Sequence, residues 1–223
     1  MKVILFGATG MIGQGVLREC LLDPAVERVL TIGRAVTGQQ HEKLREIAHG
    51  NLFDLSDIAG DLSGYDACLF CLGVASTGMS EEQYRHVTYD LTLSVARILL
   101  ERSPSLRFLF VSGAGTDSTE HGRTMWARVK GQTENALLEL PFKDSYMLRP
   151  GFIQPKHGIQ SRTTLYRVVY AIMTPFYPVL RALFSKSVTD TEQLGRAMLD
   201  VAKRGAPKRV LEATDLVAIG QGI

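Results

Sequence analysis

One stretch constrains the fold more than any other: the apolar run 2–6 leads directly into Gly7-Ala8-Thr9-Gly10-Met11-Ile12-Gly13. A buried strand that breaks into a glycine turn and then a helix is typical of a phosphate-binding loop. The first glycine allows a sharp turn, the second lets a pyrophosphate approach the backbone, and the third lets the helix pack closely on its strand. Free N–H groups and a partial positive charge at the helix start also favour a phosphate. We therefore expect a dinucleotide to be held by Gly7, Thr9, Gly10, Met11, Ile12 and Gly13.

The spacing of these glycines is G-x-x-G-x-x-G rather than G-x-G-x-x-G. A glycine triplet alone is weak evidence, but here a strand precedes it and a helix follows. The variant resembles the T-G-x-x-G-x-x-G fingerprint of the short-chain dehydrogenase/reductase superfamily, especially of its extended and atypical members. The resemblance implies a nucleotide-binding Rossmann fold. A Rossmann unit that binds no nucleotide is the alternative.

The second strand bears on the choice of cofactor. The run 28–32 is apolar and β-branched, and it ends in Gly33-Arg34. An NAD-binding fold is expected to carry an acid about 20 residues past the glycine turn, where it accepts a hydrogen bond from the ribose 2′-hydroxyl. This chain offers Arg34 there and no carboxylate nearby, and a guanidinium suits the 2′-phosphate of NADP. The sequence therefore predicts NADP(H), with a solvated loop arginine as the alternative.

Two further stretches are expected at the cofactor. Asp54-Leu55 follows the third-strand signal, and in the superfamily such an acid hydrogen-bonds the adenine amino group. An aspartate that caps a helix or a turn is the alternative interpretation. Leu72-Gly73 ends the fourth strand at the carboxyl edge of the sheet, where ligands of open α/β sheets bind. Gly73 would let the ribose pass close to the backbone, and an ordinary turn glycine is the alternative.

The order of elements predicts the fold class. Strand and helix patterns alternate along the chain, which is typical of α/β proteins with a doubly wound parallel sheet. We expect strands at 2–6, 28–32, near 47–49 leading into 51–55, and at 65–72, 106–112, 145–148 and 209–212. Helices are expected after the glycine turn and at 80–101, 125–140 and 189–203. Ser80 is the expected N-cap of the longest helix, with Glu81-Glu82 in its first turn.

Composition limits the remaining classes of function. With 223 residues, 45% of them hydrophobic, the chain is expected to form a single domain over 1–223 with a full core. A net charge of +2 without lysine or arginine blocks argues against a nucleic-acid partner. The chain begins directly on its first strand, and its three cysteines fit a reducing cytosol, so a cytoplasmic location is expected.

Neither a redox pair nor a metal site is expected. Cys68-x-x-Cys71 lies in the apolar run 67–72, which is typical of a buried strand, whereas redox C-x-x-C motifs lie at a helix N-terminus. Residues three apart on a strand also point to opposite faces. The five histidines are scattered without metal-ligand spacing.

The resemblance also implies a catalytic set. Short-chain reductases use a Ser or Thr that polarises the carbonyl, a Tyr that gives the proton, and a Lys four residues later that lowers the tyrosine pKa and holds the ribose. Ser112 occupies the serine position at the end of the fifth strand, and Lys130 occupies the lysine position. The tyrosine position on the same helix face is Trp126, and its indole N–H cannot be released near neutral pH.

Two of these positions have alternative interpretations. Lys130 could pair with Glu134 one helical turn away, a contact worth roughly a few tenths of a kcal/mol. Trp126 is either a stacking platform beside the nicotinamide or a core or interface aromatic. The order of the glycine turn, Ser112 and Lys130 along the chain favours the cofactor role for the lysine.

Further segments extend the resemblance. Pro150-Gly151 resembles the sixth-strand segment that passes over the nicotinamide. Together with the runs 129–134 and 194–198, the order of motifs is similar to that of the atypical, Tat-interacting-protein-like branch of the superfamily. This likeness implies NADP(H) binding. It does not imply turnover, because the proton donor departs from the pattern.

The C-terminal third is expected to cover the site. Residues 155–205 are interpreted as a helical lid or substrate-side subdomain, and the apolar stretch 165–184 as a lid or as the subunit interface of a homodimer. The uncharged run within it is well short of the ~20 residues of a membrane-spanning helix. Contact with a membrane surface is the alternative.

The sequence leaves three functional hypotheses. The first is an NADPH-dependent oxidoreductase of a small carbonyl compound, with its proton supplied by water relayed through Lys130 or by Tyr166 or Tyr170. The second is a redox-sensing or regulatory protein that binds NADP(H) without turnover. The third is a nucleotide-sugar epimerase or dehydratase, for which the chain is short because such enzymes generally have a larger C-terminal substrate domain.

Overall fold

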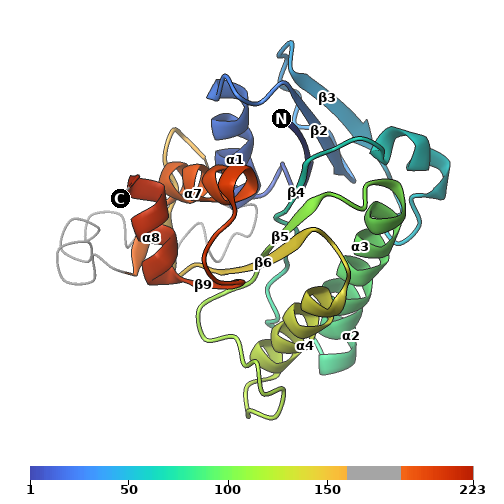
Figure 1. Cartoon of the computed structure of the whole chain (residues 1–223). Coiled ribbons are helices and arrows are strands. Elements are labelled where there is room, and N and C mark those ends of the chain that lie inside the picture. Colours follow the sequence, from blue (N-terminus) through green and yellow to red (C-terminus); the bar gives the residue numbers. More distant parts are fainter. Residues whose placement is uncertain (160–186, 223) are drawn as a thin grey trace.

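A computed structural model describes residues 1–159 and 187–222, and in these ranges seven strands form one parallel sheet (Figure 1). The strands are β1 (Lys2–Phe6), β2 (Arg28–Gly33), β3 (Leu44–Ala48), β4 (Ala67–Phe70), β5 (Arg107–Val111), β6 (Asp144–Arg149) and β9 (Val210–Glu212). Their spatial order is β3-β2-β1-β4-β5-β6-β9. The order reverses between β1 and β4, which confirms the doubly wound sheet and places its switch point there.

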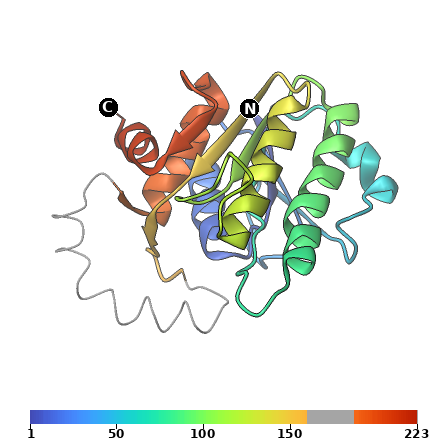
Figure 2. The same cartoon turned by 90° about the horizontal axis from the view of Figure 1, so that it is seen from below.

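Both faces of the sheet are buried, which is why its central strands are continuous apolar runs. Side chains alternate along β1, so that Val3 and Leu5 face one core while Ile4 and Phe6 face the other. The first core packs against α1 (Met11–Leu22), α7 (Thr191–Arg204) and α8 (Ala213–Gln221). The second core packs against α3 (Leu91–Arg102) and α4 (Met125–Glu139). Figure 2 shows these two helical layers on opposite sides of the sheet.

The helix expected at 80–101 is present, with one irregular turn. It consists of α2 (Glu81–Arg85), a π-helical stretch over His86–Asp90, and α3. Ser80 is the N-cap, and its capping box is complete: Ser80 Oγ accepts from Gln83 N at 3.2 Å, and Gln83 Oε1 accepts from Ser80 N at 3.0 Å. The π-helical stretch packs against α4, and no pattern in the sequence indicates it.

The third strand differs most from the expectation. It covers Leu44–Ala48, and residues 51–55 form a turn before the 3-10 helix Ser56–Leu62. This strand lies at the edge of the sheet, where Leu44 and Ile47 are only partly buried and Arg45 is exposed. A half-buried edge strand lacks the continuous apolar run that marks the central strands, which explains the error in its boundaries.

Helix α7 belongs to the core of the sheet and not to a lid, which corrects the limits expected for the segment 155–205. It packs along α1, and a Cβ placed on Gly15 would lie 2.6 Å from Thr191 O, so the two helices approach as closely as backbones allow. None of the helices in the described ranges combines the length and the apolar character needed to cross a bilayer.

A small parallel sheet, which the sequence did not predict, lies beside the main one. It pairs β7 (Phe152–Gln154) with β8 (Val188–Asp190). These strands flank residues 160–186, which lie outside the described ranges. The lid or interface expected at 165–184, with Tyr166 and Tyr170, therefore lies outside the described residues.

Candidate functional site

Five parallel strands bring the predicted site residues to one edge of the sheet. Gly7 follows β1, Arg34 follows β2, Leu72 follows β4, Ser112 follows β5 and Pro150 follows β6. All five positions lie at carboxyl ends of strands, on both sides of the switch point between β1 and β4. Ligands of doubly wound sheets bind at this edge, so the sequence motifs and the topology indicate the same place.

The three glycines of the amino-terminal loop have different steric roles. Gly7 has φ +82°, and a Cβ there would lie 2.7 Å from the backbone of Cys71. A Cβ on Gly13 would lie 2.0 Å from Gly7 O, so only glycine lets α1 begin this close to the turn. Among residues 1–159 and 187–222, a Cβ on Gly10 would meet only Gly7 O, at 3.3 Å. The space beside Gly10 is therefore open, as a bound pyrophosphate requires.

The start of α1 leaves its backbone donors available. Gly10 is the N-cap, no side chain of the described residues caps the helix, and its first turn holds no acidic residue. Met11 and Ile12 pack their side chains against the first core, and Thr9 O accepts from Gln14 Nε2 at 3.2 Å. The first N–H groups of the helix thus lack the usual side-chain partner, and this fits a phosphate ligand.

Arg34 lies beside this loop. A pocket of about 70 Å³ opens between the ends of β1 and β2, and it is lined by residues 7–9, 31–35, Leu52 and Leu72. The guanidinium is exposed and makes no hydrogen bond or ion pair with any residue of the described ranges. A cation without a protein partner next to an uncapped helix start fits a ligand that carries more than one phosphate.

One carboxylate near this strand end escaped the sequence analysis. Glu46 lies directly opposite Thr31 in the β2–β3 register, and its Oε2 accepts from Thr31 Oγ1 at 3.0 Å and from Thr37 N at 2.9 Å. Its Oε1 accepts from Gly38 N at 3.2 Å. Burial alone would raise the pKa of Glu46, but these hydrogen bonds outweigh it and lower the pKa. Glu46 therefore holds the loop after Arg34 and has little capacity left for a ribose hydroxyl.

The residues predicted near the adenine are not all brought together. Asp54 is exposed and accepts from Ser56 N at 3.0 Å, as a turn aspartate does, and this contact lowers its pKa. It lines a separate hollow against α3, of about 360 Å³, and not the pocket at Arg34. Leu55 is 2% exposed and belongs to the second core, so only its backbone is available to a ligand. Gly73 is exposed, with no atom within 4 Å of an added Cβ.

Lys130 reaches the end of β5 from helix α4. Its Nζ lies 3.4 Å from Val111 O, the carbonyl just before Ser112, and 5.2 Å from the centre of the Phe110 ring. Burial of the amine lowers the pKa of Lys130 to about 8, although the negative charge of Glu134 acts in the opposite direction. A lysine in this state can hold or release a proton near neutral pH.

The ion pair considered for Lys130 is not formed. Glu134, fully buried, is bound by Arg149: Nε donates to Oε1 at 3.0 Å, and Nη2 donates to Oε2 at 2.5 Å. Arg149 also donates to Glu212 Oε1 at 3.0 Å and to Ser118 Oγ at 2.5 Å. This network joins α4, β6, β9 and the loop after β5. Its arginine is 15 residues away from Glu134 in the chain, so spacing on one helix could not reveal it.

Trp126 covers the turn that follows Ser112. Its Cη2 would lie 3.6 Å from a Cβ on Gly115, and its Cζ3 4.0 Å from one on Gly113. Trp126 is partly buried, so it packs on the loop without being fully covered. Both interpretations of Trp126, a platform for the nicotinamide and a packing aromatic, are compatible with this position.

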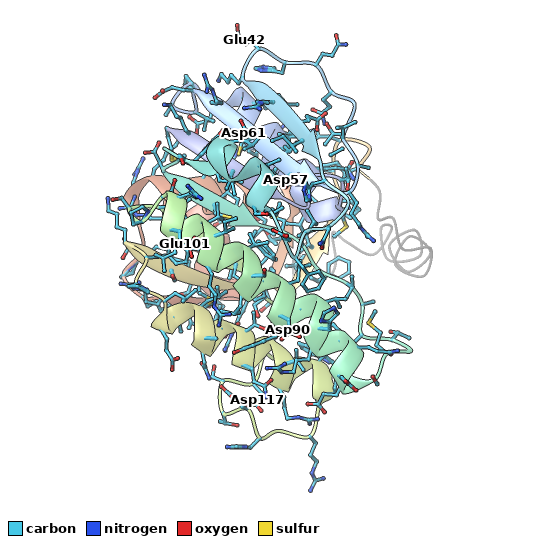
Figure 3. All side chains as sticks on the ribbon, turned by 90° about the vertical axis from the view of Figure 1, so that its right-hand side faces the viewer. Glu42, Asp57, Asp61, Asp90, Glu101 and Asp117 are labelled. Carbon is cyan, nitrogen blue, oxygen red and sulfur yellow. The ribbon has the colours of Figure 1, made fainter. Side chains whose placement is uncertain are left out.

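The loop after β5 is fixed on both sides. Ala114 N donates to Pro150 O at 3.0 Å, and a Cβ on Gly131 would lie 1.8 Å from Asp117 O, so the loop lies directly on α4. Figure 3 shows the labelled Asp117 on this loop, alongside α4. Ser112 N itself donates to Leu148 O of β6 at 2.7 Å. Gly151 is constrained as well, because a Cβ there would lie 2.4 Å from Ser187 O.

Comparisons with known proteins bear on the family and the fold. The model of the NAD dependent epimerase/dehydratase family matches residues 3–125. The protein fmp52-2, mitochondrial, of Aspergillus oryzae is 24% identical over 223 residues, which cover 97% of this chain and 96% of that protein. The protein fmp52, mitochondrial, of Emericella nidulans is 30% identical over 162 residues, which cover 68% of this chain and 66% of that protein.

A solved structure shows the same fold. It is a UDP-N-acetylglucosamine 4-epimerase from Methanobrevibacter ruminantium in complex with UDP-N-acetylmuramic acid. Its TM-score is 0.69 at 16% identity, and the match covers 94% of this chain and 74% of that chain.

The names of the curated relatives contradict the cytoplasmic location expected from the sequence. Both relatives are named as mitochondrial proteins. Three unpaired cysteines fit any compartment that keeps thiols reduced, so the cysteine count could not choose among such compartments.

Proposed function

Because the chain belongs to the NAD-dependent epimerase/dehydratase family, we propose that it binds NADP(H) and acts as an atypical short-chain oxidoreductase on a small carbonyl compound. The fold of this family binds NAD(P) cofactors. The preference for the phosphorylated form, the turnover and the substrate class are our proposals.

The observation that carries the cofactor proposal is the pairing of Arg34 with the open side of the glycine loop. Arg34 and residues 7–9 line one pocket, and the guanidinium has no partner in the described part of the chain. Glu46, which lies opposite Thr31 on the neighbouring strand, is already hydrogen-bonded by Thr31, Thr37 and Gly38. This arrangement supports a 2′-phosphate next to Arg34 better than a free 2′-hydroxyl.

The catalytic proposal rests on Ser112 and Lys130. When bound, a nicotinamide supplies or removes a hydride at the substrate carbon. Lys130 would hold the proton that the substrate oxygen exchanges, directly or through water, because its pKa is lowered to about 8 by burial. Ser112 would hydrogen-bond that oxygen. Trp126 would then shape the pocket, since an indole cannot replace the proton donor.

The cofactor proposal is tested by charge removal at Arg34. We expect Arg34→Gln to weaken NADPH binding by about 10- to 100-fold, as loss of a charge-assisted hydrogen bond does, and to leave NADH binding nearly unchanged. Arg28→Gln is the matched control, because Arg28 lies at the opposite end of the same strand. Calorimetric titration of wild type, Arg34→Gln and Arg28→Gln with both reduced cofactors gives the six dissociation constants. Equal losses for NADPH and NADH in Arg34→Gln would disprove the assignment.

Turnover is tested by following NADPH absorbance with a panel of aldehydes and quinones. Loss of activity in both Ser112→Ala and Lys130→Met, with NADPH still bound, supports the oxidoreductase. Activity that survives both substitutions removes the catalytic assignment.

A second function, cofactor sensing without turnover, is favoured by one observation: Trp126 stands where the superfamily has its proton-donating tyrosine. Tight NADPH binding by a protein that oxidises it with no compound of the panel supports this alternative. Activity gained in Trp126→Tyr would show that the missing phenol is the sole defect.

A further inference from the structure

The turn after β5 returns a second hydroxyl to Ser112. Thr116 N donates to Gly113 O at 3.2 Å, which closes a four-residue turn. The third residue of this turn, Gly115, has φ +86°, the conformation that a type II turn requires there. The sequence Gly113-Ala114-Gly115-Thr116 thus directs the threonine side chain back toward the end of the strand.

The two hydroxyls and one carbonyl form a short chain of hydrogen bonds. Ser112 Oγ lies 2.9 Å from Thr116 Oγ1, and Thr116 Oγ1 lies 2.8 Å from Gly113 O. Ser112 is 8% exposed and Thr116 is 7% exposed, so water competes little for these contacts. Thr116 was not among the residues expected at the site, although the G-x-G-T turn signal is present in the sequence.

The number of hydroxyl hydrogens determines which atom donates and which accepts in each of these hydrogen bonds. A carbonyl oxygen only accepts, so Thr116 must donate its single hydroxyl hydrogen to Gly113 O. Thr116 Oγ1 then has only lone pairs to offer, and Ser112 must donate to it. The hydrogen of Ser112 is thereby committed inside the protein, and the free capacity of its oxygen is that of an acceptor.

We propose that Thr116 is a positioning residue that makes Ser112 a hydrogen-bond acceptor, so that this site favours ligands whose reacting oxygen is a hydroxyl. The proposal rests on the proposed oxidoreductase function and deepens it. Of an alcohol and the corresponding carbonyl compound, the alcohol is bound more tightly at Ser112, because its O–H can donate to the serine oxygen. A carbonyl needs a donor, so the Thr116–Gly113 bond must first break and Thr116 must rotate to donate to Ser112.

The direction of the chain is tested without any ligand. A neutron crystal structure of the deuterated full-length protein shows the position of each hydroxyl deuterium. We expect the deuterium of Ser112 to point at Thr116 Oγ1 and that of Thr116 to point at Gly113 O. A Ser112 deuterium directed away from Thr116 overturns the proposal. This measurement is independent of cofactor binding, so it can fail while the proposed function stands.

The consequence for ligands is tested with cyclohexanol and cyclohexanone as probes, each titrated by NMR into the cofactor-free protein, in which neither probe can react. Loss of one hydrogen bond predicts that wild type binds the alcohol about three- to tenfold more tightly than the ketone. Thr116→Val keeps the shape but lacks the hydroxyl, and we expect it to lose this preference. Thr116→Ser keeps the hydroxyl and should retain it.

Three outcomes count against the proposal or its premise. Equal alcohol-to-ketone ratios in wild type and Thr116→Val overturn the positioning role, and so does the absence of binding by either probe. Failure of the wild type to bind NADPH contradicts the proposed function instead. The unfolding temperature of each variant identifies a general loss of structure. Such a loss would weaken the binding of both probes by the same factor and leave the ratio of their affinities unchanged.

Discussion

Gly10 and Gly13 belong to one loop and are needed for different reasons. A Cβ on Gly13 would lie 2.0 Å from Gly7 O, inside the protein, whereas one on Gly10 would meet only that oxygen, at 3.3 Å. We therefore expect Gly13→Ala to destabilise the fold by about 2 kcal/mol or more, as overpacking does. Gly10→Ala is expected to fold with nearly wild-type stability and to lose NADPH binding by at least about tenfold, because its methyl group occupies the phosphate space.

The two measurements are urea unfolding and calorimetric titration with NADPH, on both variants. The pair serves as its own control, since the substitution is the same and the positions are three residues apart. If Gly10→Ala bound NADPH as wild type does, the open space at Gly10 would not be the phosphate site.

Lys130 predicts a pH dependence with a defined sign. Burial lowers its pKa to about 8, so the amine loses its proton above that pH in the folded protein. If Lys130 supplies the proton in carbonyl reduction, kcat/KM is expected to be level below about pH 8 and to fall by about tenfold per pH unit above it. The measurement is a pH profile of NADPH oxidation with an active aldehyde or quinone. In Lys130→Met any residual activity should lack this limb.

The same group affects stability in the opposite direction. Between about pH 8 and the ordinary lysine pKa of about 10.4, the unfolded chain binds more protons at this site than the folded chain does. Its contribution to the free energy of unfolding therefore rises with pH across this window. If kcat/KM fell above about pH 8 because the protein unfolds, the free energy of unfolding would fall over the same pH range. Titration of Lys130 predicts that its contribution to this free energy rises, so the two causes can be distinguished.

At the scale of elements, the pair between Glu134 and Arg149 fastens α4 to β6. Glu134 is fully buried and Arg149 is 8% exposed, so breaking the pair leaves a charge without its partner inside the protein. We expect Glu134→Gln to lower the free energy of unfolding by about 3 kcal/mol. The matched control is Asp200→Asn, which breaks an exposed i,i+4 pair with Arg204 on α7 and should cost less than about 1 kcal/mol.

Urea unfolding of the two variants gives both values. If Glu134→Gln lost as little unfolding free energy as Asp200→Asn, the contacts of Arg149 with Ser118 and Glu212 would be sufficient partners for the guanidinium without Glu134. Lys130 offers a second readout, because the negative charge of Glu134 raises its pKa. The pH limb assigned to Lys130 is therefore expected to shift to lower pH in Glu134→Gln.

Which elements the sequence predicted correctly depends on how they are buried. β1 and β5 have both faces covered, so their apolar runs are continuous, and the expected limits differ from the observed ones by one residue at most. The edge strand β3, the π-helical stretch and the helix α8 depend on contacts between distant segments. The partner of Glu134 shows the same limit, because the helix offered a nearby lysine while the fold supplied an arginine from β6.

At the scale of the whole molecule, cofactor binding and folding are linked. The proposed dinucleotide contacts come from loops after β1, β2, β4 and β6, which are together only in the folded chain. NADPH at 100 times its Kd is then expected to stabilise the protein by about 2.7 kcal/mol. For a domain of this size that corresponds to a rise in Tm of about 5–10 °C, measured by scanning fluorimetry. NADH at the same concentration should give a smaller shift, and equal shifts would contradict the role of Arg34.

The place of the site followed from the sequence, while its internal bonding did not. Strand–turn–helix order predicts which residues meet at the carboxyl edge, and Gly7, Arg34, Ser112 and Pro150 do so. The hydrogen bonds that hold these residues and their loops in place involve Glu46, Thr116 and Arg149. Each depends on strand register or turn geometry that no motif encodes.

Because the chain is synthesised from its amino end, α1 is made before α7, the helix against which it packs. Gly15 of α1 lies against Thr191 of α7, and both helices contribute to the first core. The apolar side of α1 therefore stays uncovered until residues 191–204 have been synthesised. Nucleotide capture is thus expected to begin only after these residues have emerged from the exit tunnel.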